Sequence, residues 1–593
     1  MSDLAALVAP AAVRFADVDP TGRLEAYLAD VDGERPQLWL RRDGGAPVRL
    51  TAHDDAVAFA AFRPGGDTSP ALVYGVDRAG DENQELRWHD LASGAARPLT
   101  AAPDARHAFG AFRPDGGALA WTTNAANGVD MDVVLHDLGD GATRRVLRGH
   151  GLRRVEAWSP CGRFLAIVGE HAALSEELHL LDLATGGLRP LLGAGGATVV
   201  RAVRFTPDGD LILVTDAGRE LAGVARLAAA DGRLSRLLAG AHEADRLALA
   251  KDARRLAVTW NVEGRTTLEL HDLVAAGPPR RFALDGVAGA PKWRPTGDAV
   301  LATVETPTTP ARPWCFHADT GEAAALDGWA VPGEQGAAPT RVQVASFDGR
   351  ALPAFLYRPP APSRGPAPAV MCVHGGPESQ WRPGYHGEVA ALLAAGWTVL
   401  APNIRGSTGY GRTFAGLDDR ERRGDAFADI AALGRWLAAH EEVDAARLAL
   451  MGQSYGGFTT LAGLARDPGR WCGGVDLYGM ADLATFLAET APYRRAHRAA
   501  EYGAPGADDP LLAELSPLAR AHEVAAPVFI AHGLADPRVR PAESRRMAAA
   551  LRTHGKTVEH LEIADEGHGF TARSTRTAVY TRALDFLRRC AAY

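Results

Sequence analysis

Long apolar runs are absent from this 593-residue sequence, and so are the marks of a secreted chain. No stretch reaches the roughly 18 consecutive apolar residues that a membrane-spanning helix needs. The first residues, MSDLAALVAPAAVRF, carry Asp3 where a secretory signal has basic residues, and Pro10 and Arg14 interrupt the apolar stretch. We therefore expect neither a membrane span nor a signal peptide.

Cysteine is also scarce. The five cysteines are widely separated, with no Cys-x-x-Cys pair and no histidines at zinc-ligand spacing: Cys161, Cys315, Cys372, Cys472 and Cys590. This pattern argues against a disulfide framework and favours a reduced, cytoplasmic location in which the cysteines are small buried hydrophobic residues.

Lysine is almost missing, since only Lys251, Lys292 and Lys556 contribute to the 64 basic residues. The 72 acidic residues outnumber them and give a formal net charge of −8. The arginines are spread through every segment, whereas a nucleic-acid-binding protein gathers its basic residues on one face. We expect no nucleic-acid partner and no cofactor, and the length predicts two to four domains.

A turn motif recurs through the first half of the chain at intervals of 44, 50, 46, 47, 44 and 44 residues. Its copies include FRPDGGALAWT, WSPCGRFLAIVG and FTPDGDLILVT, and one copy from Leu249, LAKDARRLAVTW, is degenerate. Two further short strands with a glycine-containing turn follow most copies, as in ELRWHDLASGAARPLT. Four strands per repeat predict a seven-bladed β-propeller over residues 15–335. An array of β-sandwiches with similar turns is the alternative.

After residue 335 the pattern changes to alternating strands and helices. A hairpin turns at Asp348-Gly349. Apolar strand segments follow at 369–373, 398–401, 447–451, 527–532 and 558–563, and helical periodicity is found at 388–395, 425–440, 458–466, 543–554 and 577–589. This alternation predicts a parallel, doubly wound sheet covered on both faces, so we expect an α/β-hydrolase domain over residues 336–593.

Three residues that follow predicted strands have the chemistry of a catalytic triad. Ser454 lies in GQSYGG, whose glycines permit the sharp strand-to-helix turn of a nucleophile elbow, and Asp536 and His568 follow in the order that an α/β-hydrolase imposes. A serine hydroxyl becomes nucleophilic when an imidazole accepts its proton, and a buried carboxylate holds that imidazole in one tautomer. We predict these roles for Ser454, His568 and Asp536.

Backbone amides for an oxyanion hole are predicted on both sides of the serine. The Gly375-Gly376 pair of VHGGPES lets the backbone approach a substrate and supplies one donor, and the amide of Tyr455 supplies the other.

Several nearby acids and histidines are alternatives to the predicted triad. Asp565 and Glu566 are rival acids, but they lie so near His568 in the sequence that shaping its turn is the better interpretation. His532 ends the strand before Asp536, and His374 precedes the predicted oxyanion loop and orders it. His560 and His568 lack partners at metal-ligand spacing, so we predict no metal site.

Five motifs in one order, HGGP, PNIRGSTGYG, GQSYGG, HGLADPRV and DEGHGF, follow the repeats. Together they resemble the prolyl oligopeptidase family of serine peptidases, most closely its acylaminoacyl-peptidase-like branch. The resemblance implies the triad Ser454, Asp536 and His568 and an oxyanion hole formed by the Gly376 and Tyr455 amides. It also implies that Arg538 binds a substrate carbonyl or carboxylate.

The resemblance further implies a propeller that covers the active site and admits only peptides. The residues before the first blade, 1–14, are then expected to pack back on the hydrolase. Departures from the family pattern are Ile404, in place of an aromatic residue, and Arg423-Gly424, in place of Trp-Gly. The acidic motif by which dipeptidyl peptidases hold a free amino terminus is missing, and the surroundings of Glu176-Glu177 do not match it, so dipeptide release is disfavoured.

The leading functional hypothesis is a serine peptidase that hydrolyses short peptides, N-acylated ones among them. One alternative is an esterase, amidase or acyl-transferring enzyme that acts on a peptide-like metabolite, and a second is an inactive propeller scaffold that binds peptides or partners. Phe486 and Tyr493 are candidate residues of the substrate pocket, with a place in the core as the alternative. A homo-oligomer is compatible with the sequence.

Overall fold

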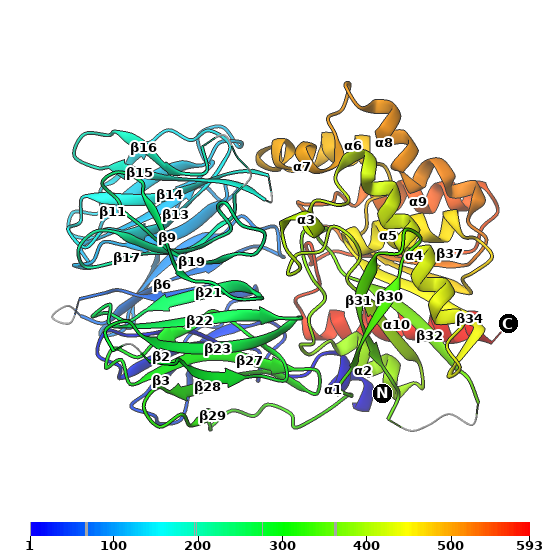
Figure 1. Cartoon of the computed structure of the whole chain (residues 1–593), viewed down its shortest axis with the longest axis horizontal. Coiled ribbons are helices and arrows are strands. Elements are labelled where there is room, and N and C mark those ends of the chain that lie inside the picture. The colour runs from blue at the N-terminus through cyan, green and yellow to red at the C-terminus, as the bar shows by residue number, and fades with distance from the viewer. Residues whose placement is uncertain are drawn as a thin grey trace.

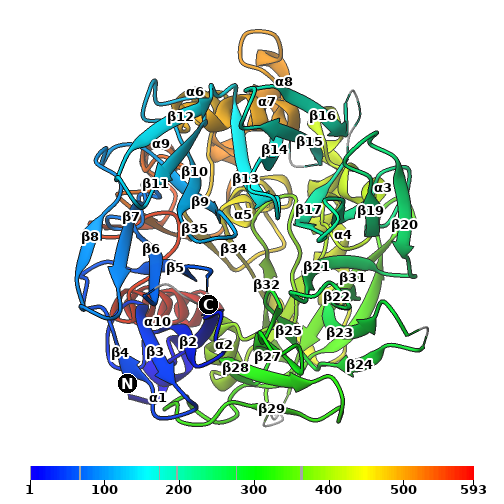
Figure 2. The same cartoon turned by 90° about the vertical axis from the view of Figure 1, so that its left-hand side faces the viewer.

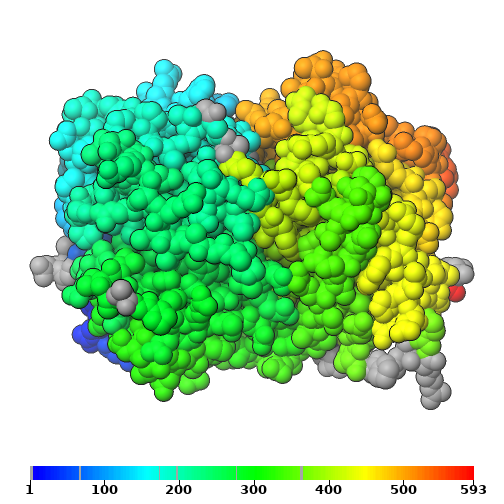
Figure 3. All heavy atoms as spheres, in the orientation of Figure 1, coloured from blue at the N-terminus to red at the C-terminus, as the bar shows by residue number. Residues whose placement is uncertain are grey.

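The computed structural model describes residues 2–65, 69–172, 174–194, 196, 198–275, 277–360 and 365–592. Two parts lie side by side, a ring of β-sheets and a sheet flanked by helices (Figure 1). On the face drawn in Figure 3 they meet along a seam. Among the described residues, no helix is both long enough and apolar enough to cross a membrane.

Seven antiparallel sheets around a central axis form the first part of the described chain and confirm the predicted seven-bladed propeller (Figure 2). Their strands are β1–β4 (Val13–Val18, Leu24–Ala29, Gln37–Arg42, Val48–Arg49), β5–β8 (Val57–Phe62, Ala71–Val76, Glu85–Asp90, Ala96–Pro98), β9–β12 (His107–Phe112, Ala118–Thr123, Asp132–Asp137, Thr143–Leu147), β13–β16 (Leu152–Trp158, Phe164–Ala172, Ser175–Asp182, Leu188–Leu192), β17–β20 (Val200–Phe205, Leu211–Thr215, Gly223–Leu227, Leu234–Leu238), β21–β24 (Glu243–Leu249, Arg255–Val262, Arg265–Asp272, Arg280–Ala283) and β25–β29 (Val287–Ala288, Lys292–Trp293, Ala299–Thr306, Thr309–His317, Ala323–Ala325).

The repeated turn joins the first two strands of a blade and keeps its conformation in the degenerate copy. In FRPDGG the amide of Gly116 donates to the Arg113 carbonyl at 2.8 Å, with φ of +73° at Gly116. In the degenerate copy Ala253 occupies the glycine position, with φ of +55° and the same bond to Ala250 at 2.8 Å. An L-residue is strained in this left-handed region, so the turn is imposed at Ala253 by the rest of the blade.

The ring closes between the first and seventh blades by side-chain contacts. Lys292 Nζ lies 2.7 Å from Asp17 Oδ1, and the Phe15 amide donates to Thr303 Oγ1 at 2.8 Å. Each blade in the described chain is built from consecutive strands, so no strand is exchanged across this junction.

The second part is an eight-stranded sheet in the order β30-β31-β33-β32-β34-β35-β36-β37. β31 is antiparallel to both its neighbours, and the strands from β33 to β37 pair in parallel, which confirms the predicted α/β-hydrolase sheet. The strands span Thr340–Ala345, Ala351–Tyr357, Ala367–Val373 (β32), Thr398–Pro402 (β33), Val443–Gln453, Gly473–Leu477, Val528–Gly533 and Val558–Ile563.

Helices cover both faces of this sheet. They are α2 (Gly387–Ala394), α3 (Arg412–Ala415), α4 (Arg423–Ala438), α5 (Tyr455–Arg466), α6 (Leu483–Glu489), α7 (Arg495–Tyr502), α8 (Asp509–Leu515), α9 (Ala542–Thr553) and α10 (Arg573–Ala591), with short 3₁₀ turns η1 (Arg420–Arg422), η2 (Pro492–Arg494) and η3 (Pro517–Glu523). α4, α5 and α9 pack on one face. α2 and α10 pack on the other face. The sheet whose strand ends carry the catalytic loops is therefore held between two apolar layers.

The chain before the first blade lies on the hydrolase. α1 (Ser2–Val8) packs against α2 and α10, where Val8 and Ala9 contact Ala391. The Tyr385 hydroxyl donates to the carbonyl of Leu7 at 2.8 Å. Met1 lies outside the described residues.

Candidate active site

Ser454 lies at a strained turn between β34 and α5. Its backbone has φ of 56° and ψ of −117°. A Cβ on Gly452 would lie 2.1 Å from the Gly456 carbonyl oxygen, and a Cβ on Gly456 would lie 2.1 Å from the Val373 oxygen. Only glycine fits at both positions, so the sequence around Ser454 permits a turn that raises the hydroxyl above the sheet edge.

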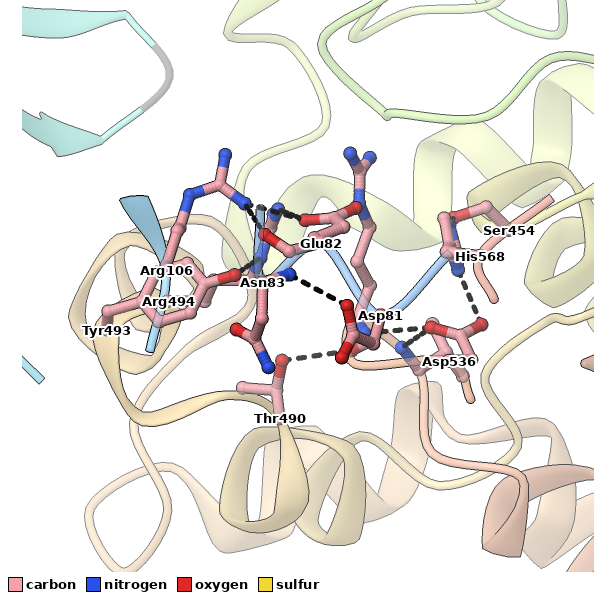
Figure 4. Close-up of polar contacts among 12 residues, drawn as sticks. Asp81, Glu82, Asn83, Arg106, Ser454, Thr490, Tyr493, Arg494, Asp536 and His568 are labelled. Atoms are coloured by element: carbon pink, nitrogen blue, oxygen red, sulfur yellow. Dashed lines mark hydrogen bonds and ion pairs between the residues drawn. The ribbon is translucent and has the colours of Figure 1, made fainter. Parts of the chain in front are cut away.

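The structure brings the three predicted triad residues into contact (Figure 4). His568 Nε2 lies 2.9 Å from Ser454 Oγ, and His568 Nδ1 lies 2.7 Å from Asp536 Oδ2. Asp536 follows β36 and His568 follows β37, so adjacent parallel strands deliver the acid and the base to the same edge. This geometry allows the imidazole to accept the serine proton.

Burial and mutual charge set the protonation states. Burial lowers the pKa of His568, and the Asp536 carboxylate opposes this only in part, so the imidazole is neutral near neutral pH. Burial alone would raise the pKa of Asp536, but His568 and His532 together hold it below its ordinary value. A neutral base beside an ionised acid is the state that activates a serine.

Asp536 is fully buried and has every oxygen engaged. Its Oδ1 accepts from the amides of Arg538 at 2.8 Å and Val539 at 3.0 Å. His532 Nε2 lies 3.2 Å from Asp536 Oδ2, and its Nδ1 lies 2.5 Å from Ser544 Oγ. His532 Nε2 also lies 2.9 Å from the Val539 carbonyl oxygen, so His532 packs beside the acid and holds the loop that follows it, a contact that the sequence did not predict.

The loop after β32 passes directly over Ser454. A side chain on Gly375 would approach the Ser454 Cβ to 3.4 Å, and Gly376 has φ of +136° before a cis bond to Pro377. Tyr455 is the first residue of α5, so no earlier helical turn supplies an acceptor for its amide. The two loops that carry the predicted oxyanion donors thus lie next to the serine.

Two of the residues considered as alternatives to the triad, His374 and Glu566, have structural contacts instead. His374 is buried, with Nε2 2.9 Å from Ser407 Oγ and Nδ1 2.7 Å from the Gly375 oxygen. Burial lowers its pKa to about 4. Glu566 accepts the amides of Thr571 at 2.8 Å and Ala572 at 2.9 Å and so shapes the His568 loop.

A propeller loop reaches the centre of this site. Residues 77–84 join β6 to β7, and a Cβ on Gly567, next to His568, would lie 2.0 Å from the Gly80 oxygen. Glu82 binds Arg538 and lies 2.9 Å from Arg494 Nη2 and 3.1 Å from Arg106 Nη1 (Figure 4). The repeats determine blade packing and carry no signal for such loops, so sequence reasoning missed Glu82.

The two predicted pocket aromatics lie in different surroundings. Phe486 is 5% exposed and belongs to the core, with its ring 5.7 Å from that of Tyr502. Tyr493 lies at the propeller interface, where the Arg106 guanidinium is 5.5 Å from its ring centroid. Tyr478 was not predicted, although its ring packs edge-on against His568 at 5.0 Å.

Three carboxylates, Asp418, Asp419 and Glu501, lie close enough together to hold a cation. The guanidinium of Arg423 binds Asp418 at 2.8 Å and also binds Glu501. The cluster therefore already contains a positive charge supplied by the chain itself.

Known proteins share the fold of this chain, and others match part of its sequence. A solved structure of puromycin hydrolase has a TM-score of 0.87 over 99% of this chain and 96% of that one, at 23% identity, and so has the same fold. Dipeptidyl aminopeptidase BIII of Pseudoxanthomonas mexicana is 34% identical over 261 residues, which cover 42% of this chain and 38% of that protein. The acylamino-acid-releasing enzyme of Homo sapiens is 26% identical over 256 residues, 42% of this chain and 34% of that protein.

The fold and the site together define a class, an α/β-hydrolase with a Ser–His–Asp arrangement beneath a β-propeller. Residues 383–592 match the model of the prolyl oligopeptidase family. The C-terminal part of the chain is a domain of that family, as the motif resemblance predicted. The matched segments span less than two-fifths of the curated relatives named above.

Proposed function

We propose that this protein is a serine peptidase that hydrolyses short peptides through an acyl-enzyme on Ser454. The observation that supports this best is the continuous contact from Asp536 through His568 to Ser454, at 2.7 and 2.9 Å. No other described pair of a neutral imidazole and a hydroxyl lies at a nucleophile elbow.

The reaction proceeds by two acyl transfers. Ser454 Oγ attacks the scissile carbonyl carbon while its proton passes to His568 Nε2, and the amides of Gly376 and Tyr455 donate to the oxygen that becomes negative. The C–N bond breaks, and His568 returns the proton to the departing amine. Water then attacks the ester carbonyl carbon while His568 takes its proton; the C–O bond to Ser454 breaks, His568 returns the proton to Ser454 Oγ, and the acid and the free serine are released.

The propeller acts as a gate in this proposal. The loop 77–84 meets the His568 loop at Gly80 and Gly567, and ion pairs hold the two parts together on several sides of the interface, as between Arg382 and Asp245 at 2.6 Å and between Arg412 and Asp216 at 2.5 Å. A site enclosed in this way is accessible to short chains and excludes folded proteins.

Charge at the site favours substrates without a free amino terminus. Glu82 is already bound by Arg106, Arg494 and Arg538, so it is not free to hold a substrate ammonium group. The three guanidinium groups instead suit a carbonyl or carboxylate oxygen, and Arg538 is the proposed donor to it. N-acylated peptides are therefore the preferred substrates, and an amide of a peptide-like metabolite is the second candidate.

The test is a matched set of substrates that differ at one end only. An N-acetylated dipeptide anilide, the same dipeptide with a free amino group, and an ester of the same acyl group are compared, with Ser454→Ala as the inactive control. We expect hydrolysis of the acetylated anilide with the highest kcat/KM. Turnover of the ester alone would indicate an esterase, and turnover of none, without labelling by a fluorophosphonate, would indicate a binding scaffold.

A further inference from the structure

A chain of buried charged groups connects the two predicted oxyanion loops and passes through Arg423. Arg423 begins α4 and has a fully buried side chain. Its Nη1 donates to Asp418 Oδ2 at 2.8 Å, and its Nη2 donates to the Glu501 carboxyl group and, at 3.3 Å, to the Glu501 carbonyl.

One arm of this chain ends on Tyr455. The Tyr455 hydroxyl donates to Asp418 Oδ2 at 2.9 Å, so the same oxygen accepts from Tyr455 and from Arg423. The guanidinium carbon also lies 5.1 Å from the Tyr455 ring centroid, a cation–π contact. Because the amide of Tyr455 is a predicted oxyanion donor, this arm fixes the residue that carries the donor.

The other arm ends beside Gly376. Glu378 pairs with Arg498 at 3.4 Å, and Arg498 lies on α7, the short helix that also carries Glu501. Burial raises the pKa of Glu501, whereas the charge of Arg498 holds the pKa of Glu378 below its ordinary value. Glu378 is two residues past Gly376, across the cis bond at Pro377.

Packing alone does not account for an arginine at this position. A buried ion pair is a weak source of stability, because desolvation of the charges offsets much of their attraction. The Nε of Arg423 is buried and, among the described residues, has no hydrogen-bond partner. An apolar side chain would fill this space with less desolvation, but it would not bind two carboxyl groups at fixed positions.

We propose that Arg423 is a positioning residue that sets the spacing of the two oxyanion loops, one through Asp418 and Tyr455 and the other through Glu501 and Glu378. This proposal rests on the proposed function for its kinetic test. A misplacement of catalytic donors by about 1 Å lowers turnover by about 100-fold, and loss of one donor lowers it by about 100- to 1,000-fold. A distortion of this kind affects the transition state more than substrate binding.

The kinetic test compares Arg423→Met, Arg423→Lys and Arg435→Met. Arg435 is an exposed arginine of the same helix and serves as the matched control. We expect Arg423→Met to lower kcat by at least about tenfold with KM changed less than about threefold, because the donors act in the transition state. Arg423→Lys, which keeps the charge, should recover part of kcat. A kcat for Arg423→Met within about twofold of Arg435→Met would overturn the proposal.

Two further measurements keep the proposal testable if Arg423→Met fails to fold or if the wild type hydrolyses no substrate. Tyr455→Phe removes only the hydroxyl that binds Asp418, and we expect a lower kcat at constant KM, whereas an unchanged kcat would contradict the proposal. Crystal structures of the wild type and of Arg423→Lys need no activity. We expect the distance between segments 375–378 and 454–456 to differ between the two structures. If both segments superpose in the two structures, the proposal is contradicted.

Discussion

Replacing Glu82 by Gln most directly tests whether the propeller influences the catalytic centre, because it removes the charge through which the propeller contacts that centre. The carboxylate of Glu82 binds three guanidinium groups, those of Arg538, Arg494 at 2.9 Å and Arg106 at 3.1 Å. The side chain of Arg538 is 45% exposed, so solvent screens that pair, and a partly exposed pair contributes about 0.2–1 kcal/mol. Three such pairs together contribute about 0.6–3 kcal/mol.

Glu82→Gln should also change the pKa of the general base, His568. The negative charge of Glu82 raises the pKa of His568, while Arg538 lowers it. Glu82→Gln therefore moves the acidic limb of the kcat/KM profile to lower pH, and Arg538→Met moves it to higher pH. A screened contribution of about 0.5 kcal/mol corresponds to a shift of about 0.4 pH unit in either direction.

The assay measures kcat/KM for a chromogenic peptide amide from pH 5 to 9 at low and high salt. With up to about 1 kcal/mol lost at Arg538, we expect Glu82→Gln to lower kcat/KM by up to about fivefold, and added salt to reduce the difference from wild type. Glu220→Gln is the matched control, since Glu220 accepts from Thr413 across the same interface without touching the arginine cluster. Equal kcat/KM values for the two variants, or a shift of the acidic limb upward in Glu82→Gln, would refute the reasoning.

Three further predictions concern the base, the hydrolase core and a propeller turn. Because burial disfavours the imidazolium of His568, kcat/KM should fall on acidification with an apparent pKa below the ordinary value of about 6.5, and a value above 7 would contradict the assignment. Asp429→Asn leaves the Arg405 guanidinium, which lies 2.8 Å from it and is almost fully buried, without its main partner. In urea unfolding, the free energy of unfolding should fall by about 3 kcal/mol in Asp429→Asn and by less than about 1 kcal/mol in Glu442→Gln, whose side chain is exposed. Equal losses in the two variants would contradict this prediction. Ala253→Gly should raise the free energy of unfolding by about 0.5–1 kcal/mol because φ of +55° strains alanine, and a decrease would show that the turn is unstrained.

The elements with a strong period were predictable from the sequence. Regular spacing of the repeated turns predicted the seven blades, and alternating strands and helices predicted a parallel sheet covered on both faces, although not its strand order. β35 was not predicted, because its sequence GGVDL opens with two glycines and resembles a loop. Its Gly474 is needed where a Cβ would lie 2.3 Å from Leu464 Cδ1, a tertiary contact that no local pattern reveals.

Some residues of the site were likewise predictable from the sequence, and others were not. Ser454, Asp536 and His568 lie in motifs that follow strands, so their convergence at one sheet edge followed from topology. Glu82 comes from a propeller loop more than 370 residues before Ser454, and only the docking of the two parts brings them together. Arg423 was noted in the sequence only as a departure from a family pattern, since its partners come from three separate segments.

The central claim is that His568 activates Ser454 as a nucleophile. Mass-spectrometric mapping of a fluorophosphonate adduct, timed in the wild type and in His568→Gln, tests it most directly. We predict an adduct on Ser454 of the wild type and a rate at least about 1,000-fold lower in the folded variant. Equal rates in the two proteins, or an adduct elsewhere on the wild-type chain, would contradict the account.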